Sequence, residues 1–277
     1  MQNLKITKKV SELFDLINEK IIPNFRKVEF DNPNNKYDFS LKQKDVEYPY
    51  SCTMEEGLII LDTILQNNLK NGYEIATAFG ISSLFIGLGF KETKGLLKTI
   101  DCYIEETKND YIYSDEEIQN HIINLKKEIE KGNYPKGLEI AKNNSDLLNI
   151  NENIEYVVGV SPQDVDKNIQ NKLDFIFIDG GHFGEQPVLD FKAIQDKLDS
   201  KCALFFHDNN GNDATLKAIK LAEEFTGVKA IKLNTHWNLT IIPINIKFNF
   251  KDKEVKEKIK NKSFLYKLFH FYWLRKK

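Results

Sequence analysis

Short apolar runs alternate along the chain with stretches in which apolar residues recur every three or four positions. The runs predict buried strands, and the stretches predict helices. The expected helices cover residues 7–22, 53–67, 81–88, 137–148, 188–198 and 214–225, and the expected strands cover 73–76, 97–101, 154–159, 173–179, 202–207, 229–233 and 239–244. This alternation predicts an α/β fold with a mostly parallel sheet and helices on both faces.

The last two expected strands break this pattern. Only residues 234–238 join them, which is too short for the helical crossover that parallel strands need. We therefore predict that the last strand is antiparallel.

Two of the apolar runs lead directly into clusters of polar residues. The run LDFIFI is followed by Asp179, with His182 three residues later, and the run CALFF is followed by His207, Asp208 and Asn209. Ligands of open α/β sheets bind just outside the carboxyl ends of the strands. If the two strands are neighbours, these side chains meet in one crevice, where they suit a metal-assisted or acid–base reaction on a small polar group.

The turn after the first expected strand reads ATAFGISS. A dinucleotide-binding turn carries G-x-G-x-x-G, but Ala76, Ala78 and Ile81 stand at the three glycine positions here, and Gly80 is the only glycine. Their β-carbons oppose the close backbone approach that a pyrophosphate requires. A smaller anion, such as an amino-acid carboxylate, still fits the helix N-terminus beside the hydroxyl of Ser82.

Asp101 ends the second expected strand, where a carboxylate can accept hydrogen bonds from both hydroxyls of a ribose. With this acid in place, the chain resembles class I S-adenosylmethionine-dependent methyltransferases, which have a Rossmann-like sheet. Among these it is most similar to metal-dependent small-molecule O-methyltransferases of the catechol, macrolide-sugar and cephamycin-pathway type. The resemblance covers about residues 50–245 and is carried by TMEEGLIILDTI, YEIATAFGISS, LLKTID, VVGVSPQDV, FIFIDGGHFGE and LFFHDNN.

The resemblance implies S-adenosylmethionine as the cofactor. Glu74 and the turn 76–80 would contact its methionine part, Ser82 the carboxylate, Asp101 the ribose and Ser161 the edge of the adenine. The cofactor-binding residues that follow are Glu74, Ala76, Thr77, Gly80, Ser82, Asp101, Ser161 and Asp179. Ala76 departs from the family, which has its first glycine at this position.

Methyl transfer from a sulfonium to a hydroxyl is an in-line displacement, so catalysis consists mainly of positioning and of deprotonating the nucleophile. Mg²⁺ on the acceptor oxygen would lower its pKa, and we predict Asp179, Asp208 and Asn209 as oxygen ligands of this ion. The register His207–Asp208 is the alternative, which we disfavour because imidazole suits Mg²⁺ poorly. His182 lies at the place of the general base in the resembling enzymes, and His207 would orient Asp208 or the acceptor. The predicted catalytic residues are therefore His182, Asp179 and His207.

The sequence thus predicts an O-methyltransferase that acts on a hydroxyl of a small acceptor, with a sugar or a glycosylated metabolite favoured. Two other classes stay open. A metal-independent N- or carboxyl-methyltransferase would share the cofactor residues. A non-enzymatic, membrane-peripheral protein would keep only the fold.

Composition divides the 277 residues into three parts. We expect an N-terminal helix and acceptor-covering segment over 1–50, the methyltransferase domain over 51–246 with a charged helical insertion at 102–135, and a basic aromatic tail over 247–277. Residues 251–277 hold ten Lys and Arg against three Asp and Glu. The end of the tail, 264–277, fits either contact with the inner face of a membrane or a helix packed on the body or on a second copy in a homodimer.

The remaining composition limits partners and compartment. A net charge of −2 gives no support for a nucleic-acid binder, and no apolar run reaches the roughly 20 residues that span a bilayer. The first residues lack the apolar stretch of a secretory signal, and the three scattered cysteines have no metal-ligand spacing. We expect a cytoplasmic protein with reduced thiols.

Overall fold

The computed structural model describes residues 52–103, 136–182, 184–209, 213–235 and 237–248, together with 123–124, 126–127, 129–131 and 211. The expected segment 1–50, most of the insertion 102–135 and the tail from 249 onward lie outside these residues. The predictions made for those parts therefore stay predictions.

A seven-stranded sheet forms the centre of the described part. Its strands are β1 (Asn71–Ile75), β2 (Leu96–Asp101), β3 (Ile154–Val158), β4 (Leu173–Ile178), β5 (Leu198–Phe206), β6 (Ile231–Lys232) and β7 (Thr240–Ile244). They lie in the order β3-β2-β1-β4-β5-β7-β6. The first five run parallel, whereas β7 is antiparallel to both β5 and β6. The predicted mostly parallel sheet with an antiparallel last strand is confirmed.

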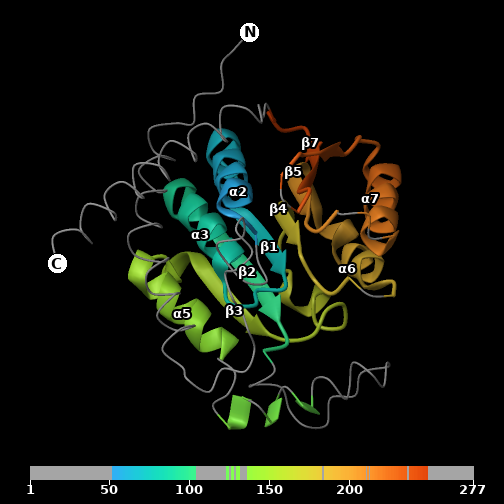
Figure 1. Ribbon diagram of the computed structural model, residues 1–277. Helices are drawn as coiled ribbons and strands as arrows, with labels where there is room; N and C mark the ends of the chain where they lie inside the picture. Colours follow the sequence, from blue (N-terminus) through green and yellow to red (C-terminus); the bar gives the residue numbers. More distant parts are fainter. Residues whose placement is uncertain are drawn as a thin grey trace, which may run out of the picture.

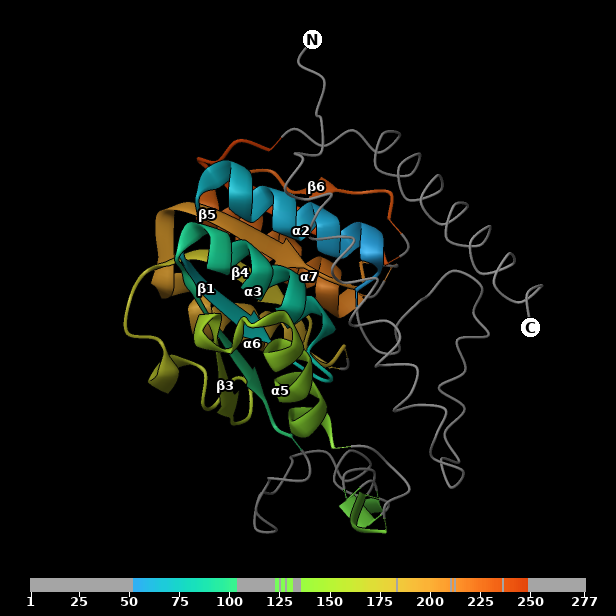
Figure 2. The ribbon, with the colours of Figure 1, turned by 90° about the vertical axis from the view of Figure 1, so that its left-hand side faces the viewer.

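Helices cover both faces of this sheet (Figure 1). One layer holds α2 (Met54–Asn67), α3 (Ile81–Thr93) and α5 (Gly137–Leu148), which Figure 2 shows in front of the sheet. The other layer holds α6 (Gln186–Ile194) and α7 (Asp213–Thr226). Single-turn 3₁₀ segments at Asn151–Asn153, Asp166–Asn168 and Gln195–Lys197 complete the described elements.

Each face of the sheet has its own apolar core, because successive side chains of a strand point to opposite faces. In β4, Phe175 and Phe177 belong to the cluster formed with α2 and α3. Ile176 and Ile178 belong to the cluster formed with α6 and α7. A strand buried on both faces reads as a continuous apolar run, which is why FIFI was recognisable in the sequence.

Several element ends differ from the prediction. The helix expected over 81–88 continues to Thr93. The helix expected over 188–198 stops at Ile194, because a 3₁₀ turn follows and Leu198 already begins β5. The strand expected over 229–233 shrinks to Ile231 and Lys232. Both of these residues are exposed at this edge of the sheet.

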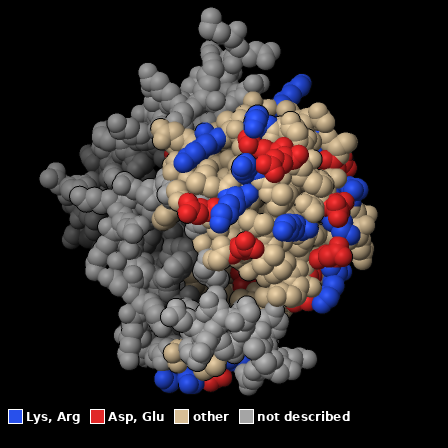
Figure 3. All heavy atoms as spheres, turned by 90° about the vertical axis from the view of Figure 1, so that its right-hand side faces the viewer, with Lys and Arg blue, Asp and Glu red and all other residues tan. Residues whose placement is uncertain are grey.

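The surface of the α7 side carries charges of both signs. Figure 3 shows Lys and Arg interleaved with Asp and Glu over this face, without a continuous patch of one sign. Within α7, Lys220 and Glu224 lie one turn apart with 4.0 Å between Nζ and Oε1. Among the described residues, no helix is long and apolar enough to cross a membrane.

Candidate active site

The tips of β4 and β5 meet at the carboxyl edge of the sheet. Ile178 pairs with Phe206 in the parallel register, so Asp179 and His207 are the first residues beyond the paired strands. The backbone N–H of His207 donates to Ile178 O at 3.1 Å, and that of Asp179 donates to Ile75 O at 3.1 Å. The predicted convergence of the two polar clusters is therefore confirmed, and it lies directly beside the tip of β1.

Three titratable side chains form a cluster that opens to solvent at this edge. One ligand atom each from Asp179, His182 and Asp208 lies within 4.8 Å of the others. His182 Nε2 is 3.2 Å from Asp208 Oδ2, and these two side chains are 28% and 30% exposed. Asp179 is more deeply set, at 12%. Two carboxylates and an imidazole at this spacing can hold a divalent cation or pass a proton.

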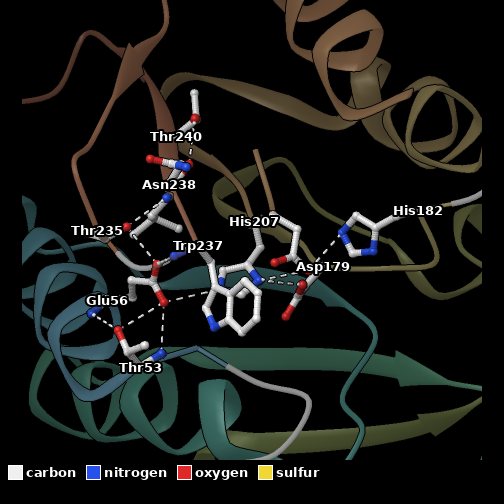
Figure 4. Close-up of polar contacts among 11 residues, drawn as sticks. Thr53, Glu56, Asp179, His182, His207, Thr235, Trp237, Asn238 and Thr240 are labelled. Carbon is white, nitrogen blue, oxygen red and sulfur yellow. Dashed lines mark hydrogen bonds and ion pairs between the residues drawn. The ribbon is translucent and has the colours of Figure 1, made fainter. Parts of the chain in front are cut away.

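His207 lies behind this cluster rather than in it (Figure 4). Its side chain is only 3% exposed and bridges two acids, with Nδ1 2.9 Å from Asp179 Oδ1 and Nε2 3.3 Å from Glu56 Oε2. Burial alone would lower the pKa of His207, but the charge of Asp179 and hydrogen bonds to Asp179, Asp208 and Glu56 raise it well above its usual value. These contacts favour the imidazolium form of His207, whose side chain is buried behind the exposed cluster. The predicted role of His207, which was to orient Asp208 or the acceptor, stays a prediction, and its Nδ1 lies 3.5 Å from Asp208 Oδ2.

Asp179 is buried next to His207, and burial and this neighbour shift its pKa in opposite directions. Burial raises the pKa of Asp179, and the positive charge of His207 opposes that rise. Asp208 adds a second, weaker contact to the imidazolium at 3.5 Å between its Oδ2 and His207 Nδ1. The ring of His207 thus contacts both carboxylates of the cluster, those of Asp179 and Asp208.

Glu56 is the member of this site that the sequence analysis missed. Thr53 and Glu56 form a capping box at the start of α2, in which each side chain bonds the other's backbone N–H. The fully buried carboxylate of Glu56 also accepts from Thr235 Oγ1 at 2.7 Å and from Trp237 N–H at 3.1 Å. Burial raises its pKa, but hydrogen bonds and charge from His207, with Thr235 and Thr53, lower the pKa of Glu56 to about 2. The T-x-x-E motif signals the cap, whereas nothing in the sequence signals a contact with a histidine 151 residues away.

Asn209, a predicted metal ligand, lies on the side of the β5 tip that faces β7. Its Nδ2 donates to Thr240 Oγ1 at 2.9 Å, and its Oδ1 is buried without a hydrogen bond to the described residues. Asp208, next to it, has a left-handed φ of 54°. This backbone turn separates the two side chains, so that Asp208 faces His182 while Asn209 faces the sheet. A metal contact of Asn209 stays a prediction.

The turn between β1 and α3 has an unusual backbone. Ala76, Ala78 and Gly80 have φ values of 75°, 47° and 83°. A β-carbon on Gly80 would also come within 2.8 Å of Ala141 Cβ, so this position needs glycine for two reasons. The two alanines instead accept a conformation that costs roughly 1–2 kcal/mol for a residue with a β-carbon.

Replacing Ala76 by Gly should therefore stabilise the protein. Relief of the left-handed strain outweighs the extra entropy of glycine in the unfolded chain, leaving a net gain of about 0.5–1 kcal/mol. Urea unfolding without added cofactor measures this gain. Ala193→Gly, within α6, is the matched control and should lose about 1 kcal/mol. A loss in both variants would contradict the strain assigned to Ala76.

Glu74 and its partners occupy the inside of this turn. The buried carboxylate of Glu74 accepts from Ser82 Oγ at 2.6 Å, from Thr99 Oγ1 at 2.6 Å and from Ser83 Oγ. Thr77 Oγ1 in turn lies 2.5 Å from Thr99 Oγ1. These side chains satisfy one another, so the turn offers a ligand its backbone N–H groups at the start of α3. Contacts of the Glu74 carboxylate and the Ser82 hydroxyl with a cofactor stay predictions, and they would require these groups to exchange partners.

The burial of Glu74 predicts a pH-dependent stability. Burial, opposed by the hydroxyls of Ser82, Ser83 and Thr99, raises the pKa of Glu74 from 4.5 to about 7. Because the folded-state pKa is raised, the stabilisation is complete below the unfolded value and is lost as pH rises through about 7. The shift corresponds to about 3 kcal/mol.

Glu74→Gln, which carries no charge, should remove this dependence. Urea unfolding below and above the window from 4.5 to about 7 compares the variant with the wild type. Glu155→Gln is the control, since Glu155 is 47% exposed and pairs with Lys98 at the surface. Parallel curves for the wild type and Glu74→Gln would contradict the assignment.

Two further predicted cofactor residues are held by hydrogen bonds at neighbouring strand ends. Asp101 accepts from the backbone N–H groups of Ala78 and Tyr103, at 2.9 and 3.0 Å, which fixes its carboxylate against the turn after β1. Ser161 Oγ donates to Asp190 Oδ1 at 2.5 Å. Burial raises the pKa of Asp190 to about 6, against hydrogen bonds from Ser161 and Gln186. Their contacts with ribose and adenine also stay predictions.

Comparison with known proteins agrees with this geometry. Residues 73–209, from β1 to the tip of β5, match a family model described as a methyltransferase domain. No curated protein matches the chain by sequence. The match and the fold support an S-adenosylmethionine-dependent methyltransferase, the enzyme class that the sequence predicted.

Two solved structures illustrate the likeness of fold. Cofactor-bound Rv0187 from MTB is 14% identical, with a TM-score of 0.51, and the alignment covers 82% of this chain and 97% of that one. A Klebsiella pneumoniae protein assigned as an O-methyltransferase is 12% identical, with a TM-score of 0.51 and coverage of 81% and 96%. The chain therefore spans almost the whole length of both.

Proposed function

We propose that the chain is an S-adenosylmethionine-dependent O-methyltransferase that uses Mg²⁺ and His182 to deprotonate a hydroxyl of a small acceptor, a sugar or a glycosylated metabolite. The observation that carries this proposal is the cluster of Asp179, His182 and Asp208 beside the tip of β1. The assignment of the Klebsiella structure as an O-methyltransferase supports the same acceptor atom.

The geometry separates a donor side from an acceptor side. The methionine part of the cofactor would lie along the backbone of the turn 76–80, with the ribose at Asp101, which is held against that turn by Ala78 N–H. Asp179 follows β4, the neighbour of β1, and its backbone N–H bonds to Ile75 O. The carboxylate cluster is therefore next to the point from which a methyl group would leave.

The donor set fits a hard divalent cation. Asp179 and Asp208 supply carboxylate oxygens, which Mg²⁺ prefers while it keeps several waters. Bound there, the ion would supply Lewis acidity that lowers the pKa of an acceptor hydroxyl. We assign His182 to proton transfer rather than to metal binding, because Mg²⁺ prefers oxygen ligands to the softer nitrogen of an imidazole. Asp208 Oδ2, 3.2 Å from His182 Nε2, stabilises the imidazolium formed when His182 takes the proton.

Trp237 supports a ring-shaped acceptor. It lies on the turn between β6 and β7, and its ring centroid is 6.3 Å from that of His207, which contacts Asp179 of the cluster (Figure 4). An indole combines a flat apolar face with a polar edge. The C–H face of a sugar ring can pack on such a surface while its hydroxyls point to the carboxylates.

The proposal is tested by measuring how much S-adenosylhomocysteine forms when S-adenosylmethionine transfers its methyl group to an acceptor. A panel of sugars, sugar nucleotides and phenols is assayed with Mg²⁺ and again with EDTA, and calorimetry with S-adenosylhomocysteine measures cofactor binding directly. We expect binding without metal and turnover of sugar-like acceptors only with metal. Turnover that resists EDTA would show a metal-independent methyltransferase instead. If the protein does not bind S-adenosylhomocysteine, the assignment as a methyltransferase is wrong.

A further inference from the structure

Glu56 contacts more segments of the site than any role in a helix cap requires. Oε2 accepts from Thr53 N–H at 2.8 Å and lies 3.3 Å from His207 Nε2, while Oε1 accepts from Thr235 Oγ1 and Trp237 N–H. Three segments converge on one buried carboxylate: the start of α2, the tip of β5 and the turn before β7 (Figure 4). The carboxylate itself is fully buried, so it touches neither solvent nor a ligand.

The first arm of this network leads to the carboxylate cluster. His207 stands between Glu56 and Asp179, with its Nε2 hydrogen-bonded to Glu56 Oε2 and its Nδ1 in an ion contact with Asp179 Oδ1. Phe177 packs against the imidazole in a T-shaped arrangement, with ring centroids 5.8 Å apart and planes at 65°. Asp179 Oδ1 contacts His207, while an oxygen of the same carboxylate lies within 4.8 Å of ligand atoms of His182 and Asp208. Carboxylate–imidazole contacts of this kind commonly fix the orientation of metal ligands.

The second arm leads to the proposed acceptor surface. The hydroxyl of Thr235 bonds Glu56 with its hydrogen and accepts Leu239 N–H at 2.9 Å, which closes the turn. Trp237 N–H donates to the same oxygen of Glu56. The backbone of Trp237 is therefore held by a residue of α2.

We propose that Glu56 is a positioning residue for methyl transfer, which holds Asp179 through His207 and holds Trp237 through the turn between β6 and β7. This inference rests on the proposed function, because it assigns Glu56 to the metal and acceptor side of that site. A helix outside the sheet then sets the spacing between the metal carboxylates and the acceptor surface. The cofactor side, at the turn 76–80, shares no contact with Glu56 among the described residues.

A matched set of variants separates this role from helix capping. Glu56→Gln replaces a carboxylate that accepts from both arms. Thr53→Ala removes the cap of the same helix but leaves the contacts of Glu56 with His207, Thr235 and Trp237 in place. Thr235→Val removes a bond of the second arm only. All are made in a Trp273→Phe background, in which Trp237 is the only tryptophan of the chain and its emission reports the turn.

The experiment measures Mn²⁺ affinity, S-adenosylhomocysteine affinity, Trp237 emission and melting temperature for each protein. For Glu56→Gln we expect a loss of Mn²⁺ affinity of about 10–100-fold, as is typical when a residue that holds a metal ligand is replaced. The emission of Trp237 should shift, and the affinity for S-adenosylhomocysteine should not change. Thr53→Ala should have a lower melting temperature but keep the Mn²⁺ affinity and the Trp237 emission of the parent protein. Thr235→Val should shift the emission and retain Mn²⁺.

Two outcomes decide against the inference. If Glu56→Gln and Thr53→Ala give the same Mn²⁺ affinity and the same emission, Glu56 only caps a helix. If the parent protein binds no Mn²⁺, the proposed metal-assisted function fails, and Trp237 emission alone then tests Glu56, with an unchanged spectrum in Glu56→Gln overturning its role. Should Glu56→Gln not fold, Glu56→Asp, which keeps the charge but withdraws it by one methylene, enters the same comparison.

Discussion

Replacing His182 by Gln should lower methyl transfer about 10²–10⁴-fold, the range expected for loss of a general base. Glutamine is close in size and retains a polar group near Asp208, but it takes up no proton at neutral pH. The acceptor would still bind, so kcat should fall while KM changes little. The rate of S-adenosylhomocysteine release, measured with the acceptor found in the panel, gives the result.

The control for this variant is the same substitution elsewhere in the chain. His121→Gln falls on the predicted insertion 102–135 and should leave kcat unchanged. Calorimetry should show that His182→Gln binds S-adenosylhomocysteine as the wild type does. A variant that kept most of its turnover would show that His182 is not the base. A variant that lost Mg²⁺ binding would make His182 a metal ligand, as the cluster geometry also permits.

The sequence predicted well whatever depends on neighbours along the chain. α5 has the predicted bounds, and the strands on either side of the site differ from the prediction only at their ends. A buried strand is a continuous apolar run, so the position of Asp179 directly after FIFI could be read from the letters alone. Its meeting with Asp208 followed from the rule that parallel strands end at one edge.

What the sequence could not give depends on pairing across the fold. Glu56 was readable as part of a capping box, but its contact with His207 joins α2 to β5 across 151 residues. His207 was expected beside Asp208 or an acceptor, and its burial between Glu56 and Asp179 could not be read from the sequence. The same limit applies to the hydrogen bond between Ser82 and Glu74, whose contacts with a cofactor stay predictions. A buried carboxylate requires donors, and here the nearest hydroxyls supply them.

Replacing His207 by Leu should cause the largest loss of stability, about 3–5 kcal/mol near neutral pH, as expected when one partner of a buried ion pair is removed. Leucine fills a similar volume but leaves the carboxylates of Glu56 and Asp179 without the cation between them. The double variant His207→Leu/Asp179→Asn should recover much of this loss, because it also removes an unpaired charge. Urea unfolding measures all three proteins.

The loss should also depend on pH, with a sign fixed by the two acids. In the wild type, the lowered pKa of Glu56, about 2, gives stability that is present above its unfolded value of 4.5 and lost as pH falls toward 2. Without His207, that stability shrinks. Burial already raises the pKa of Asp179, and loss of the imidazolium raises it further, so the folded variant gains a proton at higher pH than the wild type. The deficit of His207→Leu should therefore be greatest near neutral pH. It should narrow as the medium is acidified, because protonation neutralises the uncompensated carboxylates. It should also narrow at alkaline pH, because the wild type loses the proton of His207 as pH rises through its raised pKa. A deficit of constant size across this range would mean that His207 stabilises the fold by packing on Phe177 and Trp237 rather than by its charge.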